Sequence, residues 1–158
     1  MTQLHDQDFY LWTQAQAAAL RAEAHKLREG VREGARAEGL DFERLADAVE
    51  NIGQSNLSGR LAGARVILEL LFKLAAGRRR GKYGGWRATI IVRRAEVRAG
   101  LTEGLRNRIA QELPRLHEEA RAAVEKAFAA DEPEALPIDD TLTWTLPEIL
   151  GEDNDPLS

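Results

Sequence analysis

The sequence predicts an all-α protein, a single-domain helical bundle of five or six helices. Alanine, leucine, arginine and glutamate dominate the chain, and all four favour helix. Apolar residues also recur at steps of three and four, the spacing that places side chains on one face of a helix. The chain has 158 residues, of which 44% are hydrophobic and 30% charged, which suits one globular domain. We therefore expect residues 1–150 to form a single helical domain.

The central element is expected to be a helix over residues 57–76. Its main apolar stripe comprises Leu57, Leu61, Ala64, Leu68, Leu71 and Ala75. Ile67, Leu70 and Phe72 widen this stripe until little of the helix is suited to face water. A helix that is apolar on most sides belongs in the centre of a bundle.

A first helix is expected near the N-terminus, because Asp6 or Asp8 can cap a run that places Phe9, Trp12 and Leu20 on one face. Three glycines then interrupt the pattern, and residues 30–39 are predicted to be a long connection or a frayed helix.

Asp41 is the expected cap of the next helix, which carries Phe42, Leu45 and Ile52 on one side. Gly53 follows this short repeat, and Ser55 can start another helix. Two alternatives stay open at this point, one kinked helix over residues 42–76 or two separate helices.

Two further amphipathic runs follow. In the first, Trp86, Ile90 and Val97 share a face, with Arg94 lying between them. In the second, Thr102 precedes a helical pattern that continues to Phe128. The latter run contains Pro114, which removes a backbone donor and clashes with the preceding turn, so we expect a kink there or two abutting helices.

The C-terminal part begins with a capping box. Thr145 and Glu148 have the spacing of this motif, and Pro147 suits the first turn of a short helix. Residues 151–158 are rich in acids and are expected to form a flexible tail.

Charge is segregated along the chain. The overall charge is −4, yet residues 60–98 carry a net +9 and residues 131–158 a net −9. Arginines can contact phosphates while aromatic rings stack on bases, so segment 78–98 is a candidate site for nucleic acid or a phosphate ligand. The alternative is that its cations pair with acids of the chain itself. The candidate anion-binding residues are Arg78, Arg79, Arg80, Lys82, Arg87, Arg93 and Arg94.

Several chemistries find no support in the sequence. The chain has no cysteine, which excludes disulfides and thiolate nucleophiles. His117-Glu118-Glu119 begins like a zinc-protease motif, but Arg121 stands where the second histidine is needed. No catalytic residue, metal ligand or cofactor is therefore predicted, and an enzyme is less expected than a binding protein. The N-terminus shows no secretory signal, and no apolar run approaches the ~20 residues that span a bilayer. We expect a cytoplasmic protein without membrane contact.

The chain resembles a bacterial family catalogued as domain of unknown function 29. The similarity lies in DFYLWTQAQAAALRA, DFERLADAVENIGQSNLSGRL, the apolar helix ending in LLFKL, the GGWRATI segment and the closing TWTLPEIL. These motifs cover most of the chain in the family's order. The resemblance implies an all-helical fold and no agreed activity.

The favoured function is a small helical macromolecular-interaction module. Aromatic side chains are common interface anchors, and Tyr10 and Tyr83 are the candidates here. The expected partner is another protein or a second copy of the chain, with nucleic acid as the other class. The sequence identifies neither the partner nor the oligomeric state.

Overall fold

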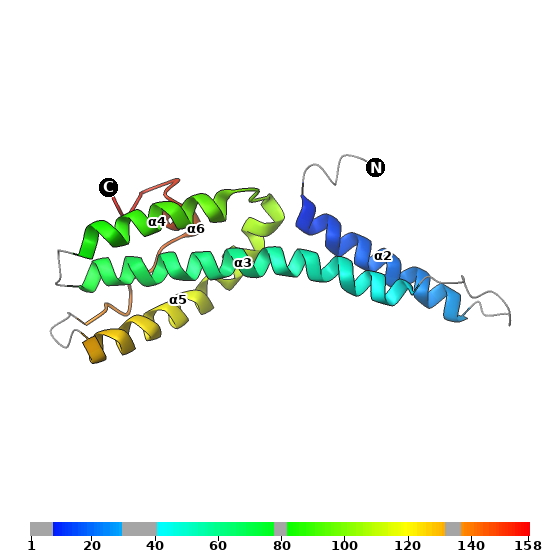
Figure 1. The fold of residues 1–158 in the computed structure, drawn as a ribbon, viewed down its shortest axis with the longest axis horizontal. Coiled ribbons are helices and arrows are strands. Elements are labelled where there is room, and N and C mark those ends of the chain that lie inside the picture. The colour runs from blue at the N-terminus through cyan, green and yellow to red at the C-terminus, as the bar shows by residue number, and fades with distance from the viewer. Residues whose placement is uncertain (1–7, 30–40, 78–81, 132–136) are drawn as a thin grey trace. The chain divides into compact units, whose positions relative to one another are not determined.

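The structure is a computed structural model that describes residues 8–29, 41–77, 82–131 and 137–158. These residues form five α-helices and no strand, which confirms the all-α prediction (Figure 1). The helices are α2 (Phe9–Glu29), α3 (Phe42–Ala76), α4 (Tyr83–Arg98), α5 (Glu103–Asp131) and α6 (Leu146–Leu150).

The chain divides into two compact units. Unit 1 comprises Met1–Leu57 and Thr102–Leu105, and unit 2 comprises Ser58–Leu101 and Arg106–Ser158. The expectation of one domain over residues 1–150 stays a prediction.

Helix starts lie where the capping residues predict them. Asp8 accepts a hydrogen bond from the Leu11 amide at 3.0 Å, and Asp41 accepts one from the Arg44 amide at 3.1 Å. The capping box predicted for the last helix is also confirmed, since Thr145 and Glu148 each bind the backbone amide of the other. Short polar side chains thus fix the beginnings of α2, α3 and α6.

α3 is one helix through Gly53, which decides between the two alternatives for residues 42–76. The helix therefore begins at Phe42, fifteen residues before the start expected at residue 57. Gly53 is buried against Thr13 of α2, and a Cβ at this position would collide with the threonine hydroxyl. The absence of a side chain at Gly53 lets α2 and α3 approach closely. The packing gained there offsets the lower helix propensity of glycine.

Unit 1 contains an antiparallel pair made by α2 and the first half of α3. Gly53 lies against Thr13, and further along the pair Arg28 binds Glu43 at 2.6 Å. The buried seam consists largely of small side chains, namely Thr13, Ala17, Ala24, Ala46 and Gly53. Small seam residues allow two helices to approach closely but bury little apolar surface.

Asp8 connects two helix starts within unit 1. Its second carboxylate oxygen accepts a hydrogen bond from the Gly104 amide at 2.6 Å, in the first turn of α5. The carboxylate is buried, and helix N-termini favour negative charge.

Unit 2 packs α4 and α5 on the second half of α3 (Figure 1). α4 approaches α3 closely at Gly63, where a Cβ would lie 2.7 Å from Val97. α5 joins α3 through an ion pair between Arg65 and Glu119 at 3.6 Å. Phe72 is fully buried in the resulting core. Pro114 lies exposed inside α5 and the helix continues on both sides, so two abutting helices are not formed; the kink stays a prediction.

Candidate functional site: the two sides of α4

Arg94 anchors the inner side of α4. Its Nε donates to the Ile149 carbonyl at 2.8 Å, and its Nη2 donates to the Glu148 carbonyl at 3.2 Å and to Asp155 Oδ1 at 2.8 Å. Only 5% of the Arg94 side chain is exposed. One guanidinium therefore binds two carbonyls at the end of α6, of which that of Glu148 also accepts from the Gly151 amide, and an acidic side chain beyond the helix.

The turn after α6 is shaped to admit this arginine. Gly151 adopts a left-handed conformation with a φ of 70°, which glycine reaches without the steric cost of a Cβ. A Cβ here would also lie 2.7 Å from Arg94 Nη1. The glycine is thus needed both for its backbone conformation and for the space it leaves.

The acidic C-terminal segment is held against unit 2 by further arginines. Arg106 binds Glu152 through two hydrogen bonds of 2.8 and 2.6 Å. Arg87 donates to the Leu157 carbonyl at 3.1 Å. The acidic segment thus meets arginines of α4 and α5, and the flexibility expected for residues 151–158 stays a prediction.

The ion pairs shift the carboxyl pKa values in one direction. The hydrogen bond from Arg94 lowers the pKa of Asp155, and the bonds from Arg106 lower the pKa of Glu152. Both groups stay ionised more readily than free carboxyls do.

The outer side of α4 is apolar as well. Its residues at successive steps of three, one and three are all exposed, and we call them the outer stripe of α4: Ala88, Ile91, Val92 and Ala95. Ile91 is 59% exposed and Val92 56%. The buried stripe on the opposite side contains Ile90 and Val97. α4 therefore presents apolar side chains on two sides, although only one of them packs in unit 2.

Charged groups border the outer stripe unevenly. One edge carries Arg87 and Arg98, which are exposed; the charge of Arg87 helps to lower the pKa of Asp155, and that of Arg98 the pKa of Glu152. The other edge carries Thr89 and Glu96, and Glu96 accepts a hydrogen bond from Arg93 at 2.8 Å. The stripe thus has one positively charged border.

The structure separates the predicted anion-binding residues. Arg78, Arg79 and Arg80 lie outside the described residues. Lys82, Arg87 and Arg93 are exposed. Arg94 is buried and donates to three acceptors of the chain itself, whereas the assignment of these residues to an anion site stays a prediction.

The two candidate interface aromatics have different surroundings. Tyr10 is 7% exposed and packs in unit 1, and its assignment as an interface residue stays a prediction. Tyr83 is half-buried, donates a hydrogen bond to the Gly77 carbonyl and lies 5.6 Å from the ring of Trp86. It also lines a shallow apolar hollow of about 280 Å³, formed by Leu71, Leu74, Ala75, Tyr83, Arg87, Trp144 and Pro156.

His117 has a structural role that the sequence did not reveal. Its Nδ1 lies 2.8 Å from the Leu113 carbonyl, which can only accept, so Nδ1 carries the proton. Its Nε2 then accepts from the Trp144 amide at 3.0 Å. The ring also stacks on the Trp144 indole, whose edge meets Phe72. The histidine thus fastens the segment before α6 onto α5.

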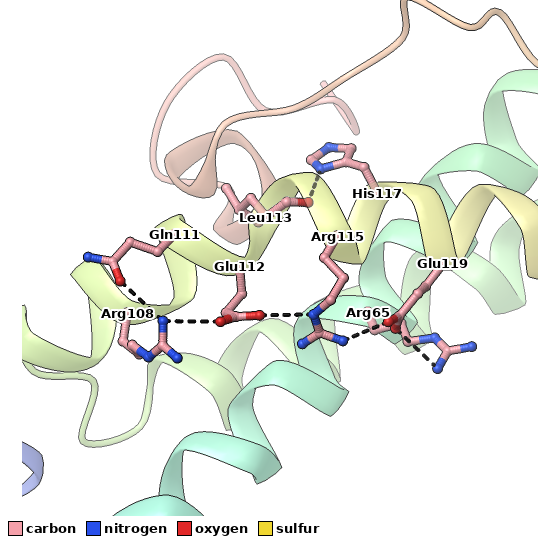
Figure 2. A network of polar contacts seen from close by, with 8 residues as sticks. All are labelled: Arg65, Arg108, Gln111, Glu112, Leu113, Arg115, His117 and Glu119. Carbon is pink, nitrogen blue, oxygen red and sulfur yellow. Dashed lines mark hydrogen bonds and ion pairs between the residues drawn. The ribbon is translucent and has the colours of Figure 1, made fainter.

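A row of exposed ion pairs follows α5 (Figure 2). Glu112 lies between Arg108 at 3.1 Å and Arg115 at 2.9 Å, and Glu119 lies between Arg115 at 2.6 Å and Arg65 of α3 at 3.6 Å. The hydrogen bond from Arg115 lowers the pKa of Glu112. Exposed pairs contribute little to stability, so this row is a solvated face rather than a reactive site.

Neither a metal-binding cluster nor a membrane-spanning helix is found in the part of the chain that the structure describes. No group of three or more histidines and acids is placed to hold a metal ion there. None of the described helices combines the length and apolarity needed to cross a membrane.

The described residues thus form an all-helical protein. Arg94 fixes one side of α4 to α6, and the other side of α4 carries the exposed outer stripe. The chain belongs to the family described as domain of unknown function DUF29, whose model matches residues 4–154. It is also similar to an α-helical protein of unknown function from Rhodospirillum rubrum, with a TM-score of 0.69 and 22% identity over 96% of this chain and 92% of that one. That likeness supports the fold alone. No curated protein matches the chain.

Proposed function

We propose that the protein is a protein-interaction module that binds an acidic amphipathic helix along the outer stripe of α4. The observation that carries this proposal is the exposure of Ile91 and Val92 on the side of α4 opposite its core contacts. A helix that is apolar on two opposite sides is typical of one that packs between two layers.

The shape and length of the surface favour a macromolecule over a small ligand. α4 has 16 residues and is therefore about 24 Å long. Its outer stripe lies on a convex helix, whereas small ligands bind in concave pockets. A second helix laid along α4 would cover Ile91 and Val92 together.

The border charges specify the partner's chemistry. Arg87 and Arg98 lie on one edge of the stripe, eleven residues apart, or about three helical turns. A partner helix with acids along one side of an apolar stripe would meet both arginines. The role of Arg94 is to hold α6 on the inner side of α4, so that the outer stripe stays accessible.

The test is a fluorescence anisotropy titration with two labelled synthetic helices. Both carry leucines at steps of three and four; one has glutamates beside the leucines and the other has lysines. We expect the glutamate peptide to bind and the lysine peptide to bind at least about tenfold more weakly. Equal binding of the two peptides, or binding of neither, would contradict the proposal.

Variants locate the binding surface. The double variant I91E/V92E is expected to weaken binding about 30-fold, because covering two half-exposed side chains of this size contributes about 2 kcal/mol. The matched control A122E/A129E adds two glutamates at exposed positions of α5 and should bind as the wild type does. A labelled single-stranded oligonucleotide tests the other macromolecular class. Salt-sensitive binding of the oligonucleotide without peptide binding would replace the present proposal.

A further inference from the structure

The helix pair of unit 1 exposes large apolar side chains while its seam buries small ones. Leu27 is 37% exposed, Leu45 41% and Ile52 54%. Fully burying a leucine or isoleucine contributes about 1.5–3 kcal/mol, which alanine cannot match. The residues with the most to gain from burial are therefore left outside the pair.

These apolar residues gather on one side of the pair. The opposite side is marked by ion pairs across the seam, from Arg21 to Asp47 at 2.9 Å and from Arg28 to Glu43 at 2.6 Å. Leu20 directly precedes Arg21 and Leu27 directly precedes Arg28. Both leucines lie on the side of α2 that is turned away from these ion pairs. Leu45, Val49 and Ile52 step by four and three residues on the far side of α3. We call this side the hairpin face: Leu20, Leu27, Leu45, Val49 and Ile52.

We propose that the hairpin face pairs with the same face of a second copy of the chain, forming a four-helix arrangement. A two-fold axis parallel to the helices lays α2 of one copy against α3 of the other. The two helices then run antiparallel, and every residue keeps its height along the pair. All neighbouring helices in the resulting bundle are antiparallel, which is the arrangement of up-down-up-down bundles.

Charge complementarity favours a second copy as the occupant. Arg21 lies opposite Asp47, so Glu23, two residues further along α2, lies opposite residue 45 and beside Arg44. On α2, Glu23 lies three residues after Leu20 and four before Leu27, and so on the same side as both. On α3, Arg44 precedes Ile52 by eight residues, or about two turns, and lies at the edge of the hairpin face. In the proposed dimer, Glu23 of each copy meets Arg44 of the other at the same height.

Both charges are held by ion pairs within their own helix, which the proposed contact between copies can replace. Glu23 is bound to Lys26 three residues away at 2.8 Å, and Arg44 to Asp41 three residues away at 3.6 Å. Such exposed pairs within one helix are weak and exchange easily. A surface that matches its own charges in this way is what a two-fold interface requires.

The area of the face is sufficient for a dimer. The unit 1 part of α3, residues 42–57, is about 24 Å long, and two packed helices are about 20 Å wide. Each copy would thus bury about 500 Å², or about 1,000 Å² in total, which reaches the lower bound for specific interfaces. We expect a reversible dimer rather than an obligate one.

Sedimentation equilibrium of the full chain tests the proposal. The wild type is expected to be a monomer–dimer mixture, and Ile52→Glu should weaken dimerisation at least about tenfold, because each substitution is present twice. The matched control Gln54→Glu places the same charge on an exposed position of α3, two turns after Asp47 and so on the ion-pair side of the pair, and should dimerise as the wild type does.

Charge reversal tests the register. Glu23→Arg and Arg44→Glu should each weaken self-association, because arginine then faces arginine, or glutamate faces glutamate. An equal mixture of the two variants should recover dimers of wild-type strength, since the mixed dimer pairs opposite charges at both sites. Rescue on mixing cannot come from contacts within one chain, which the mixture leaves unchanged.

Three results would each overturn this inference: a wild type that stays monomeric at all concentrations, a mixture that is no more dimeric than its separate components, or dimerisation that survives Ile52→Glu. The inference is independent of peptide binding by α4. The glutamate peptide should therefore bind Ile52→Glu as tightly as the wild type, so that the two proposals fail separately.

Discussion

Replacing Arg94 by alanine should cost unit 2 about 4 kcal/mol of unfolding free energy. The substitution removes two hydrogen bonds to the carbonyls of Ile149 and Glu148 and one to the carboxylate of Asp155. A hydrogen bond with a charged donor contributes about 1.5–3 kcal/mol, and the Ile149 carbonyl would lose its donor, whereas the Glu148 carbonyl keeps the bond from the Gly151 amide. We count the two carbonyl bonds fully and the bond to the part-exposed Asp155 only weakly.

The measurement is urea denaturation followed by tryptophan fluorescence, because Trp86 and Trp144 both lie in unit 2. A lower urea concentration at the unfolding midpoint, with an unchanged slope of the unfolding free energy against urea, reports lost stability rather than a change in the unfolded chain. Arg94→Lys should lose about half as much as Arg94→Ala, because a lysine ammonium lacks the planar fork that reaches three acceptors.

The control is Arg93→Ala, one residue away on the same helix. Its side chain is 45% exposed and binds only Glu96 within α4 among the described residues, so it should lose less than about 0.5 kcal/mol. The reasoning would be refuted if Arg94→Ala were no less stable than Arg93→Ala. In that case the contacts with α6 would not be what holds the inner side of α4.

Three further predictions concern the caps and the C-terminal segment. Asp8→Ala should lower the free energy of unfolding by about 2 kcal/mol in circular dichroism melts, because one carboxylate caps two helix starts; a loss typical of a single cap would contradict this. Gly151→Ala should cost about 2 kcal/mol, since φ is 70° and the new Cβ meets Arg94; an unchanged melting temperature would count against the crowding. The Arg94 hydrogen bond lowers the pKa of Asp155 from its ordinary 3.8, so its stabilising contribution is present above that value and is lost as pH falls through the lowered pKa. The stability difference between the wild type and Asp155→Asn should therefore stay constant from about pH 7 to about pH 5 and shrink as the pH falls below 3.8; a difference that does not change there would contradict this.

The helices themselves could be predicted because each rests on local signals. Periodicity located the apolar runs, and Asp8, Asp41 and Thr145 marked helix starts that the structure confirms. Local signals did not decide at Gly53 between one kinked helix and two separate helices. The reason for the glycine lies in Thr13, forty residues away, and sequence spacing does not reveal a contact at that distance.

The candidate site was predicted only in part. The sequence placed Arg94 on the buried face of its helix, between Ile90 and Val97, which was a signal that this arginine binds within the protein. Its acceptors are backbone carbonyls at the end of α6, and carbonyls carry no side-chain signature. His117 was missed for the same reason, because both of its partners are backbone groups.

The outer stripe of α4 could have been found from the sequence, because Ala88, Ile91, Val92 and Ala95 have helical spacing. It was hidden by the β-branched run at residues 89–92, which also has strand propensity. Which of the two apolar sides of α4 packs inward is a tertiary property. It follows from the glycines that admit α4 against α3, at Gly63 and Gly77.

The most direct test of the central claim is a methyl NMR titration with the glutamate-flanked peptide. The account predicts that the methyl signals of Ile91 and Val92 shift on titration, while those of the buried Ile109 and Ile149 stay in place. Unchanged Ile91 and Val92 signals at saturating peptide would contradict the claim that the outer stripe of α4 is the docking surface.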